Sequence, residues 1–307
     1  MKHTIKITLI LITMFIIAQL IGLYVINFYG YGNNLPYGME PPEKPENNQG
    51  IGFLVNVLIA FVFAIFLFFI LTKINSEKFI RLWFFVVSVI AIGLALNVFL
   101  SKINLFYPSV IALIIALPLT YLEIFKKNII LVNLNKLLVY PGIAAVFIPI
   151  LGVLGIIILL LAISLYDIWA VWHSGFMQKM ADFQINKIGV FGGFFIPFAD
   201  KKQKNKIKLL KQKYKNKSQK DLEKQFKKAK IKVNLAILGG GDIIFPIITA
   251  GIFYMALGLL SALIITASAT LGLLYLFILA EKKKYYPAMP FLTIAMYLGM
   301  MVSWLII

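Results

Sequence analysis

Apolar stretches long enough to cross a lipid bilayer fill most of this chain, and they constrain its fold more than any other feature. A helix that spans the hydrocarbon core needs about 20 predominantly apolar residues. Stretches of this kind lie at residues 5–28, 51–73, 82–101, 105–125, 134–151, 152–175, 232–252, 259–280 and 286–306. Because 61% of the residues are hydrophobic and only 14% are charged, a soluble chain of this length could not bury its apolar surface. We therefore predict an all-α polytopic membrane protein with nine transmembrane helices.

The distribution of lysines predicts how these helices are oriented. Loops that carry lysine alternate with loops that carry little or none, and cytoplasmic loops are the ones enriched in Lys and Arg. The N-terminus (Lys2, Lys6), the long tract at 201–232 and the loop at 282–284 are all basic. We therefore expect a cytoplasmic N-terminus and an outer C-terminus in the cell membrane. A count of eight or ten spans would break the alternation.

We expect one membrane-embedded domain over residues 1–307, with four parts. They are a four-helix scaffold at 1–128, spans five and six at 129–176, a basic cytoplasmic loop at 177–231, and spans seven to nine at 232–307. The fifth span is the weakest, because prolines interrupt it. The apolar stretch 189–198 is too short for a spanning helix, and its Gly, Phe and Ile content with a closing Pro favours a β-strand.

Several classes of function are not expected from the composition. The chain has no cysteine and only two histidines, His3 and His173, so we predict neither a metal site nor a cofactor. The net charge of +18 is concentrated in one loop, and Arg81 is the only arginine. Nucleic-acid readers favour arginine, so we expect the basic loop to meet anionic membrane lipids and no nucleic acid.

Two aspartates lie inside spans that are otherwise apolar, Asp167 in the sixth and Asp242 in the seventh. An ionisable residue within a membrane span is a functional-site hypothesis by default. Consecutive spans are antiparallel neighbours, and helical rise puts Asp167 about 18 Å before Lys179 and Asp242 about 15 Å after Lys232. Both acids are therefore predicted at a similar depth on the cytoplasmic side, where they could form a pair.

The residues around the acids favour a site. Gly239, Gly240 and Gly241 leave no side chains before Asp242, which permits close approach of a substrate or of a packed helix. Pro246 lacks an N–H, so the carbonyl four residues back loses its helical partner.

Other residues near the acids leave alternatives open. Tyr166 could simply pack, or it could form a hydrogen bond or a wall at the neighbouring acid. Trp169 and Trp172 are typical of an interfacial aromatic belt, and His173 is placed with them. Glu123 is predicted to snorkel toward Lys126 and Lys127 at a cytoplasmic helix end.

Three short motifs, taken in order, resemble those of a known family. They are Tyr166-Asp167 in the sixth span, Gly239-Gly240-Gly241-Asp242 in the seventh, and Pro287-Ala288-Met289 at the start of the ninth. They are similar to the YD, GxGD and PAL motifs of the presenilin and signal peptide peptidase family of intramembrane aspartyl proteases, with Met in place of Leu. The first four spans match that family only in their hydropathy.

This resemblance implies that Asp167 and Asp242 form a catalytic pair and that residues 287–289 lie beside it and help to hold the substrate. The implied partners are transmembrane-helix substrates or signal peptides. In the family, the segment after the sixth helix can pair with an unwound substrate, which would give residues 189–198 a role in β-strand addition.

Other interpretations stay open at the level of sequence. One is an enzyme that resembles prepilin peptidases, although those have fewer spans and no late Pro-Ala-Met element. A second is a transporter or channel that uses the two acids as a proton or cation relay, although no inverted repeat is evident. A third is a catalytically silent scaffold. The sequence also leaves open whether the chain forms a homo-oligomer.

Overall fold

The computed structural model describes residues 5–30, 34–39, 77–103, 105–126, 128–173, 192–198, 234–280 and 286–306, together with Gln203 and a few isolated residues between 55 and 70. The helices are α1 (Ile5–Gly30), α3 (Glu77–Lys102), α4 (Pro108–Lys126), α5 (Ile129–Phe147), α6 (Val153–Ile168), α10 (Gly241–Leu257), α11 (Leu259–Leu279) and α12 (Met289–Ile306). A π-helical turn, η1 (Trp169–His173), continues α6, and the strands are β1 (Gly193–Phe198) and β2 (Asn234–Gly239).

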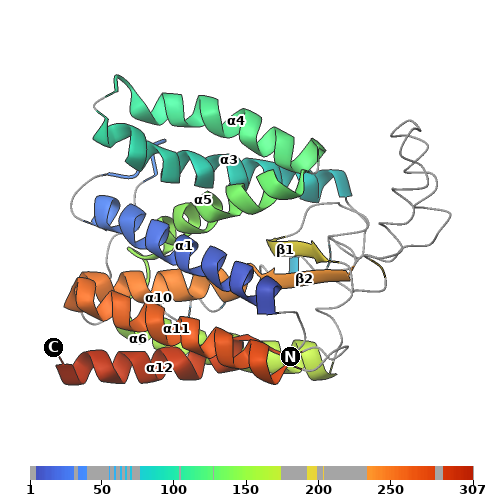
Figure 1. Ribbon diagram of the computed structural model, residues 1–307. Helices are drawn as coiled ribbons and strands as arrows, with labels where there is room; N and C mark the ends of the chain where they lie inside the picture. The colour runs from blue at the N-terminus through green and yellow to red at the C-terminus, as the bar shows by residue number, and fades with distance from the viewer. Residues whose placement is uncertain are drawn as a thin grey trace. The chain divides into compact units, whose positions relative to one another are not determined.

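The described helices confirm a mostly helical fold suited to a membrane. Seven of them, counting α6 together with η1, are long and apolar enough to span a bilayer, and α10 is a shorter apolar helix of 17 residues. The predicted second span at 51–73 lies almost wholly outside the described residues, so nine spans and their sidedness stay predictions. Helix α1 begins and α12 ends at opposite ends of the bundle, which is consistent with termini on opposite sides (Figure 1).

The predicted seventh span, 232–252, is wrong in its first part. Residues Asn234–Gly239 form strand β2, and α10 begins only at Gly241 and continues to Leu257. The glycines explain the switch, because three consecutive residues of low helix propensity span the junction: Gly239 ends β2, Gly240 lies between the elements, and Gly241 begins α10. A strand rises about 3.3 Å per residue, not 1.5 Å, so the helical depth estimate for Asp242 does not hold.

The fifth helix begins earlier than predicted. Asn128 caps α5, since its side-chain oxygen accepts a hydrogen bond from the N–H of Ile130 at 3.0 Å. The helix continues through Pro141 and ends at Phe147, before Pro149.

Strands β1 and β2 pair in a two-stranded sheet, and their arrows point in opposite directions (Figure 1). This confirms the predicted strand for residues 193–198, whereas 189–191 lie outside the described part. The chain divides into two compact units. One comprises Met1–Phe194 with Leu238–Ile307 and contains every helix named above, and the other is Phe195–Ile237.

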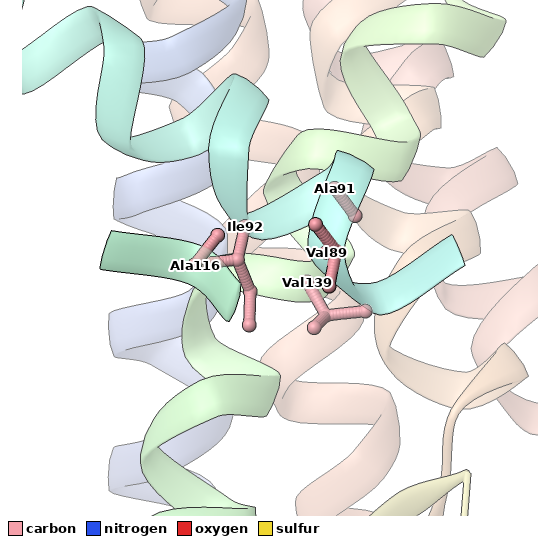
Figure 2. Close-up of a cluster of buried hydrophobic side chains, with 5 residues drawn as sticks. All are labelled: Val89, Ala91, Ile92, Ala116 and Val139. Atoms are coloured by element: carbon pink, nitrogen blue, oxygen red, sulfur yellow. The ribbon is translucent and has the colours of Figure 1, made fainter. Parts of the chain in front are cut away.

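Within the larger unit, α10 packs against several of the described helices. It contacts α1, α5, α6, α11 and α12, while α3, α4 and α5 contact one another (Figure 1). Small side chains let these helices approach closely. A Cβ on Gly142 of α5 would collide with the backbone carbonyl of Ala91 in α3. Figure 2 shows the adjacent cluster, which gathers Val89, Ala91 and Ile92 of α3, Ala116 of α4 and Val139 of α5.

A buried ion pair joins α4 to α5. Glu123 and Lys136 are each 2% exposed, and Lys136 Nζ lies 2.7 Å from Glu123 Oε1. The amide of Asn135 donates to Glu123 Oε2 at 3.0 Å. The prediction that Glu123 snorkels toward Lys126 and Lys127 is therefore wrong. The partner, Lys136, comes from the buried face of α5 and not from the residues next to Glu123 in the sequence.

Candidate active site

The three motifs come together because of how three helices are arranged. Helix α6 ends, and α10 and α12 begin, at the end of the bundle where α1 begins (Figure 1). Helix α6 contacts both α10 and α12. The segments that carry Asp167, Asp242 and Pro287–Met289 therefore meet in one region, although 120 residues separate the first motif from the last (287 minus 167).

Asp167 caps the start of α12. It is the penultimate residue of α6 and is 4% exposed. Its Oδ2 accepts a hydrogen bond from the N–H of Met289 at 3.0 Å, and the backbone of Ala288 also hydrogen-bonds to this carboxyl group. The first N–H groups of a helix lack intrahelical partners and carry positive partial charge, so they stabilise an anion placed there. The backbone of the Pro-Ala-Met element thus hydrogen-bonds to the Asp167 carboxyl group.

Polar contacts also join α6 to α12 on the N-terminal side of Asp167 in α6. The hydroxyls of Ser164 and Thr293 lie 2.7 Å apart, and both residues are buried. Tyr297 donates a hydrogen bond to the carbonyl of Ile157 at 2.6 Å. These contacts fix the register of the two helices, and the register decides which N–H of α12 reaches Asp167.

Asp242 lies in the first turn of α10 and is partly exposed. Its carboxyl group accepts a hydrogen bond from the backbone of Gly239, and it lies within electrostatic reach of Asp167. Among the described residues, neither aspartate forms an ion pair. The site therefore holds two acids of like charge, and each accepts hydrogen bonds from the backbone near the start of a helix.

Two of the three glycines lie where a side chain would make close contacts. A Cβ on Gly239 would lie 2.9 Å from Asp242 Oδ2. A Cβ on Gly240 would collide with the carbonyl of Gly192 and would lie 3.0 Å from the hydroxyl of Tyr140. By contrast, a Cβ on Gly241 would meet only Phe245, at an ordinary 3.6 Å. Gly239 and Gly240 therefore leave room beside Asp242 that a side chain would fill. Gly241 borders no such close contact.

The remaining predicted residues are placed as follows. Tyr166 is half-buried, and its ring contacts that of Trp169 with 6.4 Å between centroids, which fits a packing role. Trp169 and Trp172 are exposed, as residues of a membrane interface would be. Pro287 is buried just before α12. The described residues contain no group of three or more His, Asp or Glu side chains that could hold a metal ion.

Sequence reasoning missed two buried polar residues that touch the start of α10. Gln19 of α1 is fully buried and donates to the carbonyl of Ile243 at 3.1 Å. It is the only amide between Ile5 and Ile26, and this isolation was a usable signal. Tyr140 of α5 is 5% exposed and lies against Gly240. Nothing in the sequence distinguishes it from the other tyrosines.

Comparison with known proteins agrees with this geometry. The family described as "Signal-peptide peptidase, presenilin aspartyl protease" matches residues 12–307. The chain belongs to this family. It is thus an intramembrane aspartic peptidase by class and an integral membrane protein.

Two solved structures of a presenilin family intramembrane aspartate protease, in space groups C222 and P2, share the fold. The first is 16% identical, with a TM-score of 0.61 over 98% of this chain and 99% of that one. The second is also 16% identical, with a TM-score of 0.59 over 97% of each chain. A search of curated protein sequences finds no match.

Proposed function

We propose that this protein hydrolyses peptide bonds within the transmembrane helices or signal peptides of substrate proteins in the cell membrane, with Asp167 and Asp242 as its water-activating pair. One observation carries the proposal. Two acids from helices in contact lie within electrostatic reach of each other, with no cationic partner in the described part of a chain whose family consists of aspartyl proteases. Neighbouring carboxyls of this kind share a proton, because both cannot easily be ionised.

The chemistry follows from that shared proton. The ionised carboxylate takes a proton from a bound water as the water oxygen attacks the scissile carbonyl carbon. The protonated partner donates a hydrogen bond to the carbonyl oxygen and stabilises the charge that develops there. Transfer of the proton to the departing amine then breaks the C–N bond. The two acids titrate as a pair, so the roles of base and acid belong to the pair and not to one named residue.

The surroundings support this use of the acids. Backbone N–H groups orient Asp167, and Gly239 and Gly240 keep side chains away from Asp242. A substrate helix must unwind locally, because its peptide bonds are otherwise shielded. Strands β1 and β2 form a two-stranded sheet, so an unwound substrate segment could add to it as a third strand.

The test is cleavage of a fluorogenic transmembrane peptide by purified protein in detergent or liposomes. Asp167→Asn and Asp242→Asn should each abolish cleavage, and a transition-state analogue should inhibit the wild-type protein. Wild-type turnover by either variant would refute the pairing. Proton or cation flux without cleavage would instead support the relay interpretation.

A further inference from the structure

Tyr140 is buried at the acids although it belongs to none of the three motifs. It lies on α5, it is 5% exposed, and its hydroxyl has no hydrogen-bond partner among the described residues. Leaving a buried hydroxyl unpaired costs about 1–3 kcal/mol. Such a group therefore needs a partner that arrives with water or with substrate.

The surroundings of the hydroxyl show where such a partner would lie. The hydroxyl is 3.0 Å from the Cβ position of Gly240, and the carbonyl of Gly192 borders the same position. The neighbouring Gly239 has its Cβ position 2.9 Å from Asp242 Oδ2. The phenol also lies within electrostatic reach of Asp242. Three oxygen-bearing groups, from Tyr140, Gly192 and Asp242, thus surround one glycine turn.

One contact holds the Tyr140 ring directly, and an ion pair anchors the helix that carries it. The ring meets Phe194 edge-on, with 5.9 Å between centroids. Lys136, one helical turn earlier on the same face of α5, is fixed to Glu123 in α4 by the ion pair described above. The side chain is therefore presented rigidly from a helix, as a positioning group must be.

We propose that Tyr140 is a positioning residue for Asp242, and that its hydroxyl donates a hydrogen bond to the Asp242 carboxyl group through one bridging water. This inference rests on the proposed function. A polar site with two to four partners can hold such a water, and the Tyr140 hydroxyl and the Asp242 carboxyl group would supply two of them. The phenol would thereby keep Asp242 oriented toward the substrate without taking part in bond breaking.

The experiment compares Tyr140→Phe with the wild-type protein in the fluorogenic peptide assay. Phenylalanine keeps the ring packing against Gly240 and Phe194 and removes only the hydroxyl. We expect kcat to fall about 10- to 100-fold, because small errors in orientation are costly, with KM within twofold and thermal unfolding unchanged. The affinity of a transition-state analogue should fall in parallel with kcat.

Tyr29→Phe is the matched control, because it removes a hydroxyl that donates to the carbonyl of Leu94 in α3, at the end of α1 away from the acids. It should retain wild-type kcat. An unchanged kcat in Tyr140→Phe, or a loss explained by KM or by stability, would overturn the inference. Asp242→Asn separates the two proposals. If it is inactive while Tyr140→Phe is fully active, only the role of Tyr140 fails. If it retains turnover, the proposed function fails first.

Discussion

Two groups of acids among the helices of this protein differ in how their charge is balanced. Glu123 has a cation at 2.7 Å and an amide at 3.0 Å, so its negative charge is compensated within α4 and α5. Asp167 and Asp242 have backbone N–H groups and each other. A compensated ion pair costs desolvation but is chemically quiet. Two uncompensated acids in one site instead compete for a proton, which is a condition for acid–base chemistry.

The comparison teaches that an acid in a membrane span is not by itself evidence of catalysis. Burial alone does not separate Glu123 from Asp167, since they are 2% and 4% exposed. Their partners differ: Glu123 is paired with a cation, whereas Asp167 accepts hydrogen bonds from backbone N–H groups. One group should therefore control stability and the other should control activity, and four predictions test that division.

The largest effect is expected on activity at the aspartates. Asp242→Asn should lower kcat by about 10³-fold or more, because one member of the acid–base pair is lost. Its thermal unfolding should stay near that of the wild type, since no ion pair is broken. Fluorogenic cleavage and a melting curve on one preparation check both parts. A large drop in melting temperature would show that Asp242 is structural.

Breaking the ion pair should show the reverse pattern. Lys136→Met leaves Glu123 buried and unpaired, which should cost about 3–5 kcal/mol in the free energy of unfolding. The double variant Glu123→Leu/Lys136→Met should recover most of this loss, since it removes both charges. Reversible unfolding in mixed micelles measures the cycle. Failure of the second change to restore stability would show that the partners act separately.

The glycine turn should show an intermediate effect. Gly240→Ala introduces a Cβ that collides with the carbonyl of Gly192, and overpacking of this kind costs about 1–3 kcal/mol. Gly241→Ala is the matched control, because its Cβ would make only an ordinary contact with Phe245. Unfolding and cleavage should both distinguish the two variants. Equal behaviour would mean that the turn can relax.

The smallest effect is expected between α6 and α12. Ser164→Ala removes the hydroxyl contact with Thr293 and should cost about 1 kcal/mol. Cleavage should fall modestly, because the start of α12 would hold Asp167 less firmly. An unfolding measurement beside a KM and kcat determination checks this. A complete loss of activity would indicate that the contact does more than set helix register.

The sequence predicted those features that depend on local chemistry. Apolar length located most of the described spans, and the motif residues led to Asp167, Asp242 and Met289. It could not show the strand at 234–239, because an apolar run next to glycines has no period that separates a strand from a buried helix. It also missed Lys136 as the partner of Glu123 and Tyr140 beside Gly240. Both are tertiary contacts that depend on which face of α5 is buried.

The cap that Asp167 places on α12 has a pharmacological consequence. The amide hydrogen of Met289 is a donor that a carbonyl-bearing compound could compete for only if it entered the buried site. A compound that captured it would turn the carboxyl group out of alignment without contacting Asp242. On the proposed mechanism, inhibition therefore need not imitate the tetrahedral carbon of a reacting peptide, because the start of the last helix could be targeted to displace Asp167.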